Sequence, residues 1–74
     1  MKIQKKFGII IKTLRNEKGI SQETLAFDAD IDRTYISDIE KGNRNVSIEI
    51  IERLANYFHI SVSELLKKVE NYGK

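Results

Sequence analysis

The sequence predicts an all-α fold, a compact bundle of five short helices. In every segment between turn residues, apolar residues recur at steps of three and four, which places them along one helical face. No run alternates β-branched and aromatic residues as a strand would, and no Asn-Gly hairpin turn is present. The 74 residues suit one domain, and no linker, internal repeat or low-complexity tract divides them.

The first helix is expected over residues 3–18. Gly19 follows the cationic Lys18, and this pair suits a helix that ends in a left-handed turn. Its apolar face is formed by Ile3, Phe7, Ile10, Ile11 and Leu14.

Two further helices are expected on either side of a short turn. One covers about residues 21–28 and the other residues 33–41, with Asp30 in the turn and Gly42 as the end of the second. Their N-caps are Ser21 and Asp32. Their inner side chains are Leu25, Ala26, Ala29, Ile36 and Ile39.

The last two helices begin at serines. Ser47 caps the fourth, after a polar loop over residues 43–46, and Ser61 forms a capping box with Glu64 at the start of the fifth. The fifth runs to about residue 69, and residues 71–74 are expected to fray. The inner face of the fourth helix is Ile48, Ile51, Leu54, Ala55 and Phe58.

The spacing over residues 21–41 is typical of a helix-turn-helix. Ala26 must be small because the following helix crosses close over it, and Ile36 and Ile39 fix that helix from within. In such a pair the second helix can enter the major groove of DNA. The side chains that it then turns outward are Arg33, Thr34, Ser37 and Asp38.

The runs Leu14–Ala26 and Tyr35–Gly42 resemble the Cro/CI-type (Xre-like) helix-turn-helix repressors, and residues 32–37 followed by Arg44-Asn45 look most like restriction–modification controller proteins. The resemblance implies a lambda-repressor-like, five-helix DNA-binding fold. It also implies an ion pair between Arg15 and Glu40 with a scaffolding role. One departure is Asp30, where the family often has Gly. An acidic residue tolerates the turn but repels a nearby phosphate, so a close approach of the DNA backbone is not expected at this point.

Four side chains are candidates for base contact. Arg33 at the start of its helix can donate two hydrogen bonds to guanine O6 and N7. Thr34 and Ser37 can touch a base edge or a thymine methyl, or can be plain surface hydroxyls. Asp38 can accept from cytosine N4, although a carboxylate near phosphates is unfavourable, and an exposed or arginine-paired residue is the preferred interpretation.

Gln22 is a candidate for contact with the phosphate backbone, because its amide and the helix N-terminus both suit an anion. The family resemblance supports this role and extends it to Tyr35, Asn43, Arg44 and Asn45. Without the resemblance, residues 43–45 are simply a polar loop.

The segment over about residues 58–72 holds more apolar residues than one helical stripe against the core requires. We expect a homodimer through it, which would present two recognition helices to half-sites about 34 Å apart; the alternative is that all of these residues complete the core of one chain. The candidate interface residues are Phe58, Ile60, Val62, Leu65, Leu66, Val69 and Tyr72.

Charge and composition restrict the other functions. The net charge of +2 divides into +5 over residues 1–19 (six cations, one anion) and −3 over residues 20–74 (seven cations, ten anions), so bulk charge favours a polyanion only weakly. Cysteine is absent, which excludes disulfides and thiolate sites. No membrane span or signal peptide is evident, and we expect a cytoplasmic protein.

No catalytic or metal site is expected. Asp28, Asp30 and Asp32 imitate the start of a calcium loop, but Arg33 and Ile39 occupy positions that require Gly and Glu. His59 is the only histidine and is expected to end a helix. No cofactor or small-molecule ligand is implied, and the serines are interpreted as caps.

The sequence therefore predicts a dimeric, sequence-specific regulator that binds a palindromic operator in double-stranded DNA. Its resemblance to controller proteins implies control of its own gene and a nuclease gene. The alternative is an antitoxin-like adaptor that binds a protein and has weak affinity for DNA.

Overall fold

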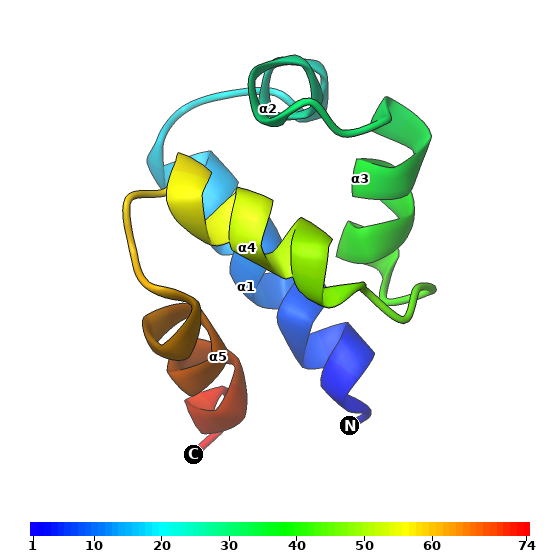
Figure 1. Cartoon of the computed structure of the whole chain (residues 1–74). Helices are drawn as coiled ribbons and strands as arrows, with labels where there is room; N and C mark the ends of the chain where they lie inside the picture. The colour runs from blue at the N-terminus through cyan, green and yellow to red at the C-terminus, as the bar shows by residue number, and fades with distance from the viewer.

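A computed structural model describes all residues from 1 to 74. It contains five helices and no strand (Figure 1): α1 (Ile3–Glu17), α2 (Gln22–Ala29), α3 (Arg33–Lys41), α4 (Ile48–Tyr57) and α5 (Val62–Asn71). The all-α prediction is confirmed, and each boundary lies within two residues of its expected position. No helix has the length and apolar character needed to cross a membrane.

Side-chain caps set the start of four helices. Ser21, Asp32, Ser47 and Ser61 each accept a hydrogen bond from a backbone N–H in the first turn of the helix that follows. The predicted capping box of α5 is present, since Glu64 also accepts from the backbone N–H of Ser61. Such caps satisfy donors that a helix cannot bond internally.

Left-handed residues end the helices where the sequence predicts. Asp30 has φ of 56° between α2 and α3, Gly42 has φ of 77° after α3, and His59 has φ of 58° after α4. The carbonyl oxygen of Asp30 accepts a hydrogen bond of 2.8 Å from Arg53 in α4. The turn of the helix-turn-helix is thus held from outside the motif.

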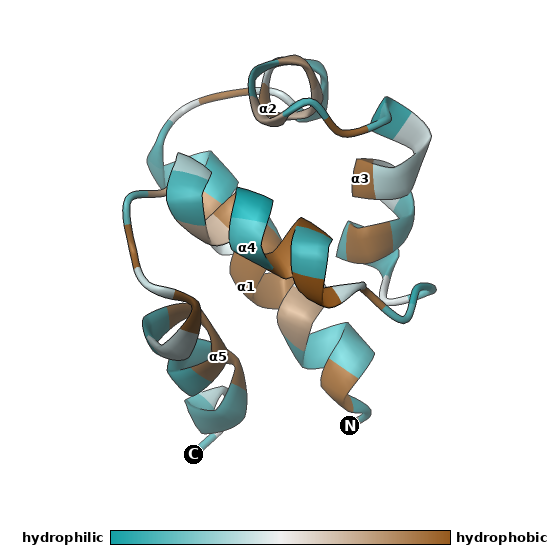
Figure 2. Cartoon of the chain, in the orientation of Figure 1, coloured by the Kyte–Doolittle hydropathy of each residue, from teal (hydrophilic) through white to brown (hydrophobic).

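The core lies between the apolar faces of the five helices, whose outer faces are mostly polar (Figure 2). α1 packs against α3 and α5, while α2 packs against α3 and α4. The fully buried large side chains are Ile11, Leu25, Ile36, Ile39, Leu54, Leu65 and Val69.

Two expected core residues are exposed. Ile3 and Ile48 retain 58% and 82% of their accessible surface, so their placement on inner faces was wrong. Each is the first residue of its helix, and the first turn projects beyond the packed rows. In α4 the buried row is made instead by Ile50 and Leu54, which are one turn apart.

Gly8 permits the closest approach of α1 to α3. A Cβ atom at this position would collide with the carbonyl oxygen of Ile39 and would lie 3.0 Å from that of Glu40. Because both obstacles are backbone atoms, they cannot rotate away. Gly8 therefore sets how closely α1 lies against the C-terminal end of α3.

Candidate nucleic-acid interface

Within the helix-turn-helix, some side chains of α3 are buried against the core and others are exposed to solvent. Ile36 and Ile39 are buried, and Ala26 of α2 is buried as the spacing predicts. Arg33 and Thr34 are exposed in the first turn of α3, at its N-terminal end. The geometry therefore leaves the first turn of α3 available for contact with a partner.

The side chain of Arg33 is 63% exposed. Its only charged neighbour within ion-pair distance is Glu23 of α2, whose Oε1 atom lies 3.9 Å from Nε. A pair this long and this well solvated contributes little to stability. Arg33 can therefore leave Glu23 at small cost and donate to another acceptor.

A second cluster joins α3 to the loop that follows it. It consists of Tyr35 and Asp38 of α3 and Arg44 of the loop. The guanidinium carbon of Arg44 lies 4.4 Å from the centre of the Tyr35 ring, and Nε lies 3.5 Å from Oδ2 of Asp38. Asp38 is thus paired with an arginine, one of the two states that the sequence favours for it. Stacking on the ring and the ion pair both limit where the guanidinium can go.

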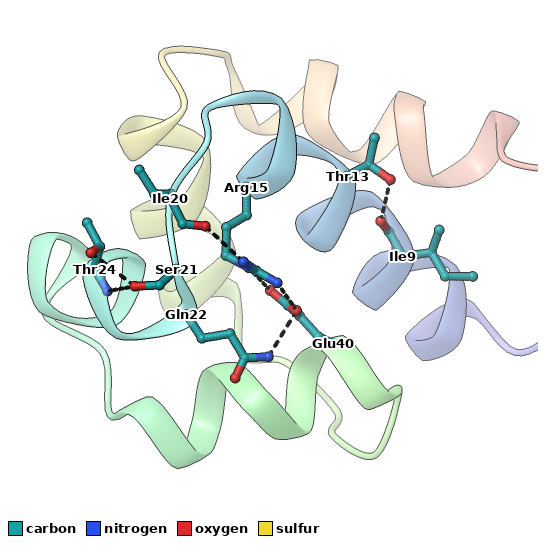
Figure 3. Close-up of polar contacts among 8 residues, drawn as sticks. All are labelled: Ile9, Thr13, Arg15, Ile20, Ser21, Gln22, Thr24 and Glu40. Carbon is teal, nitrogen blue, oxygen red and sulfur yellow. Dashed lines mark hydrogen bonds and ion pairs between the residues drawn. The ribbon is translucent and has the colours of Figure 1, made fainter.

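A part-buried polar network fixes the other end of α3 (Figure 3). Arg15 donates from Nε to Glu40 Oε2 over 2.7 Å and from Nη2 to Oε1 over 3.0 Å, and its Nη1 donates to the carbonyl oxygen of Ile20 over 2.8 Å. The side chains of Arg15 and Glu40 are only 12% and 4% exposed. This two-bond geometry matches the ion pair that the family resemblance implies.

Glu40 raises the pKa of Arg15, chiefly by accepting its hydrogen bonds, and this effect outweighs the opposing desolvation. The pKa of Tyr57 is also raised. The larger cause is desolvation by burial, and the smaller one is the hydrogen bond to Asp28. That hydroxyl donates to Asp28 Oδ2 over 3.1 Å and ties α4 to the end of α2. Both shifted groups are scaffolding contacts beside the helix-turn-helix.

Gln22 joins the network at the N-terminus of α2. Its Nε2 donates to Glu40 Oε1 over 3.0 Å, as Figure 3 shows. An amide nitrogen carries two hydrogens, so one remains for a further acceptor. The predicted phosphate contact of Gln22 is compatible with this arrangement, and Glu40 would orient the amide for it.

The loop after α3 carries the other candidate backbone contacts. Asn43, Arg44 and Asn45 are all exposed. Asn45 is held by Gln4 of α1, whose side-chain Nε2 donates to Asn45 Oδ1. No local pattern predicts this contact, because the two residues are 41 positions apart in the sequence.

The predicted dimer segment requires a correction. Leu65 and Val69 retain 0% and 1% of their surface, so they pack in the core of one chain and have no surface to offer a second. They lie one turn apart on the inner row of α5. Phe58, Ile60 and Val62 are half-buried against the core, whereas Leu66 and Tyr72 are exposed.

Exposed apolar residues outside the predicted segment lie near Leu66. Ile3 and Leu66 line the same hollow between α1 and α5. Val46 and Ile51 line an adjoining one with Leu66 and Ile3. Periodicity could not reveal this surface, because it combines residues from three separate segments.

No three His, Asp or Glu side chains come together in a way that could hold a metal ion.

The most exposed hydrophobic side chain is Phe27 on the outer side of α2.

The fold and this surface define a DNA-binding helix-turn-helix protein. The helix-turn-helix family matches residues 11–65, and the chain belongs to that family.

Within the family, the chain is similar to restriction–modification controller proteins. It is 45% identical over 69 residues to the control protein C.MunI of a Mycoplasma species, covering 92% of this chain and 93% of that protein. The crystal structure of the controller C.AhdI from Aeromonas hydrophila superposes with a TM-score of 0.79 at 47% identity, over 84% of this chain and 94% of the other. The C.Esp1396I tetramer in complex with its natural 35-base-pair operator matches at 35% identity and a TM-score of 0.78, over 96% and 99% of the two chains.

Proposed function

We propose that this chain is a restriction–modification controller that binds operator DNA and regulates transcription. Its operator would lie before its own gene and a nuclease gene, and the protein would act in the cytoplasm, where that DNA is. Controller relatives of nearly the same length support this function, one of them in complex with its operator.

The observation that carries the proposal is that α3 is packed into the core by some residues and leaves others exposed in its first turn. Ile36 and Ile39 are buried and hold the helix against the core, whereas Arg33 and Thr34 in its first turn are exposed to solvent. Residues at this end of a recognition helix contact base edges when the helix lies in the major groove. We assign base contact to Arg33, with Thr34 and Ser37 beside it.

Contacts with the DNA phosphate backbone would surround Arg33. Gln22 lies at the start of α2, and Tyr35, Asn43, Arg44 and Asn45 lie at or after α3. Amides, a phenol and a guanidinium are all donors for phosphate oxygens. Such contacts fix the register of the protein on the duplex without choosing the sequence. Asp38 would act indirectly, by holding Arg44 over Tyr35.

The protein would act as a homodimer. We place the interface on the exposed apolar residues Leu66 and Ile3, which line one hollow, and on Val46 and Ile51 of the adjoining hollow. Tyr72, exposed at the end of α5, would extend it. The substitution Leu66→Glu would put a charge into this surface while leaving the core residue Leu65 intact. We expect sedimentation to show a monomer for Leu66→Glu and a dimer for Lys68→Glu, a charge change elsewhere on α5.

Selection of bound fragments from a random duplex pool tests the function. The proposal predicts a symmetric consensus with half-site centres about 34 Å apart, one turn of the duplex. A titration of that consensus and of random duplex should then differ by a factor of at least about 10³ in affinity. Recovery of unenriched sequences with weak, equal affinities would contradict it and favour the adaptor alternative.

A further inference from the structure

The start of α1 and the loop after α3 form one positively charged surface. It comprises Lys2, Gln4 and Lys5 of the N-terminal segment with Asn43, Arg44 and Asn45 of the loop, and we call it the α1–loop surface. Figure 1 shows the beginning of α1 near this loop, and Figure 2 shows hydrophilic residues in both segments. The two segments are far apart in the sequence but adjacent in the fold.

Two contacts join the segments. Gln4 donates its side-chain hydrogen bond to Asn45. Lys5 packs against Gly42, where an added Cβ atom would lie only 3.0 Å from the Lys5 Cα atom. These contacts hold α1 against the loop from both sides of Arg44, so the relative position of the lysines and the loop is set by the fold.

Between them lies a hollow of about 210 Å³ with no apolar residue in its lining. Lys2, Gln4, Asn43, Arg44 and Asn45 surround it, together with Gly42. Its lining supplies ammonium, guanidinium and amide donors, which are the groups that bind phosphate oxygens.

The two lysines of this surface lack an ion-pair partner, whereas Arg44 is paired with Asp38. Lys2 and Lys5 are exposed and take part in none of the four ion pairs of the chain. The first turn of α1 contains no acidic residue, and no carboxylate precedes Glu17 in the sequence. The cluster therefore raises a positive potential that an anionic partner would relieve.

We propose that the α1–loop surface binds the sugar–phosphate backbone of operator DNA, with Lys2 and Lys5 as phosphate contacts additional to those of the loop. This inference rests on the proposed function, because the loop is itself assigned to the DNA backbone. The proposed DNA contacts would then extend from the loop to α1, and the N-terminal segment would be part of the interface. These contacts would contribute affinity on any duplex and no choice of sequence.

The test is the salt dependence of DNA binding by the double variant Lys2→Gln/Lys5→Gln. Each phosphate contact contributes about 0.9 to the slope of log affinity against log salt concentration. We expect the slope to flatten by about two units for each bound chain, with equal fold losses on the selected operator and on random duplex. Circular dichroism would check that the helices remain formed.

Lys18→Gln/Lys68→Gln is the matched control, with the same change in net charge. Lys18 lies at the opposite end of α1 near Tyr57, and Lys68 lines a hollow between α1 and α5 beside Glu17. This control should keep the wild-type slope. An unchanged slope in Lys2→Gln/Lys5→Gln, or equal flattening in both variants, would overturn the inference while the wild type still binds its operator. Failure of the wild-type protein to prefer any duplex would instead reject the proposed function, and this inference with it.

Discussion

The two ends of α3 differ in how the fold holds them. At the C-terminal end, the side chain of Glu40 is only 4% exposed and accepts hydrogen bonds from both Arg15 and Gln22. At the N-terminal end, Arg33 is exposed and its ion-pair distance to Glu23 is 3.9 Å. A short helix can thus be rigidly placed at one end and keep the other end available.

The difference has a physical cause. A buried ion pair is costly to break, because the partner that remains is an uncompensated charge in a poorly solvated place. An exposed pair is replaced by water at almost no cost. Stability is therefore concentrated at Glu40 and binding capacity at Arg33, and substitutions at the two ends should affect different measurements.

The largest effect is expected for Glu40→Ala. It leaves the Arg15 guanidinium without its carboxylate and should lower the free energy of unfolding by about 3–5 kcal/mol. Urea unfolding followed by circular dichroism measures this loss. Glu52→Ala removes an exposed carboxylate that has no ion pair, and it should change stability by less than about 0.5 kcal/mol. A small loss for Glu40→Ala would show that the network does not anchor α3.

A loss is also expected for Gly8→Ala, where two effects oppose each other. Alanine favours a helix over glycine by about 1 kcal/mol. The collision of its Cβ atom with the backbone of Ile39 should cost more, so that the net destabilisation is about 1–3 kcal/mol. Thermal unfolding compared with Lys12→Ala, an exposed position on α1, measures the sign. A stabilised Gly8→Ala would mean that α1 can move away from α3 freely.

For Arg33→Ala we expect unfolding free energy within about 0.5 kcal/mol of the wild type. Operator affinity should fall by about 1–3 kcal/mol, because a bidentate contact to one base is lost. Fluorescence titration and urea unfolding on the same sample separate the two quantities. Equal losses of stability in Arg33→Ala and Glu40→Ala would remove the distinction between the ends of α3.

Arg44→Ala should have the smallest effect on discrimination. Loss of a phosphate contact lowers affinity for all duplexes by a similar factor and flattens the salt slope by about one unit for each chain. Titrations at several salt concentrations, with operator and random duplex in parallel, measure both effects. A selective loss on the operator alone would identify Arg44 as a base contact.

Most of the fold could be predicted because its signals are local. Serine caps, the left-handed Asp30 and the spacing of Ile36 and Ile39 each act within one or two turns of the chain, and all are present in the structure. The exposure of Ile48 was missed because periodicity gives a face but not the point where packing ends.

The candidate site was predictable only in part. The position of Arg33 follows from the helix-turn-helix pattern, and the Arg15–Glu40 pair follows from the family resemblance. The contact of Gln4 with Asn45, and the approach of α1 at Gly8, depend on how distant segments meet. A single sequence carries no signal for such pairs, and it could not show that Leu65 and Val69 belong to the core while Leu66 does not.

The most direct test of base reading by α3 compares the wild type with Arg33→Ala on a panel of operators that differ at one base pair. We predict that the wild type discriminates against the wrong base at the guanine position by about 1–3 kcal/mol, and that Arg33→Ala binds all four bases there with equal affinity. Discrimination that survives unchanged in Arg33→Ala would contradict the assignment of this arginine as the base reader.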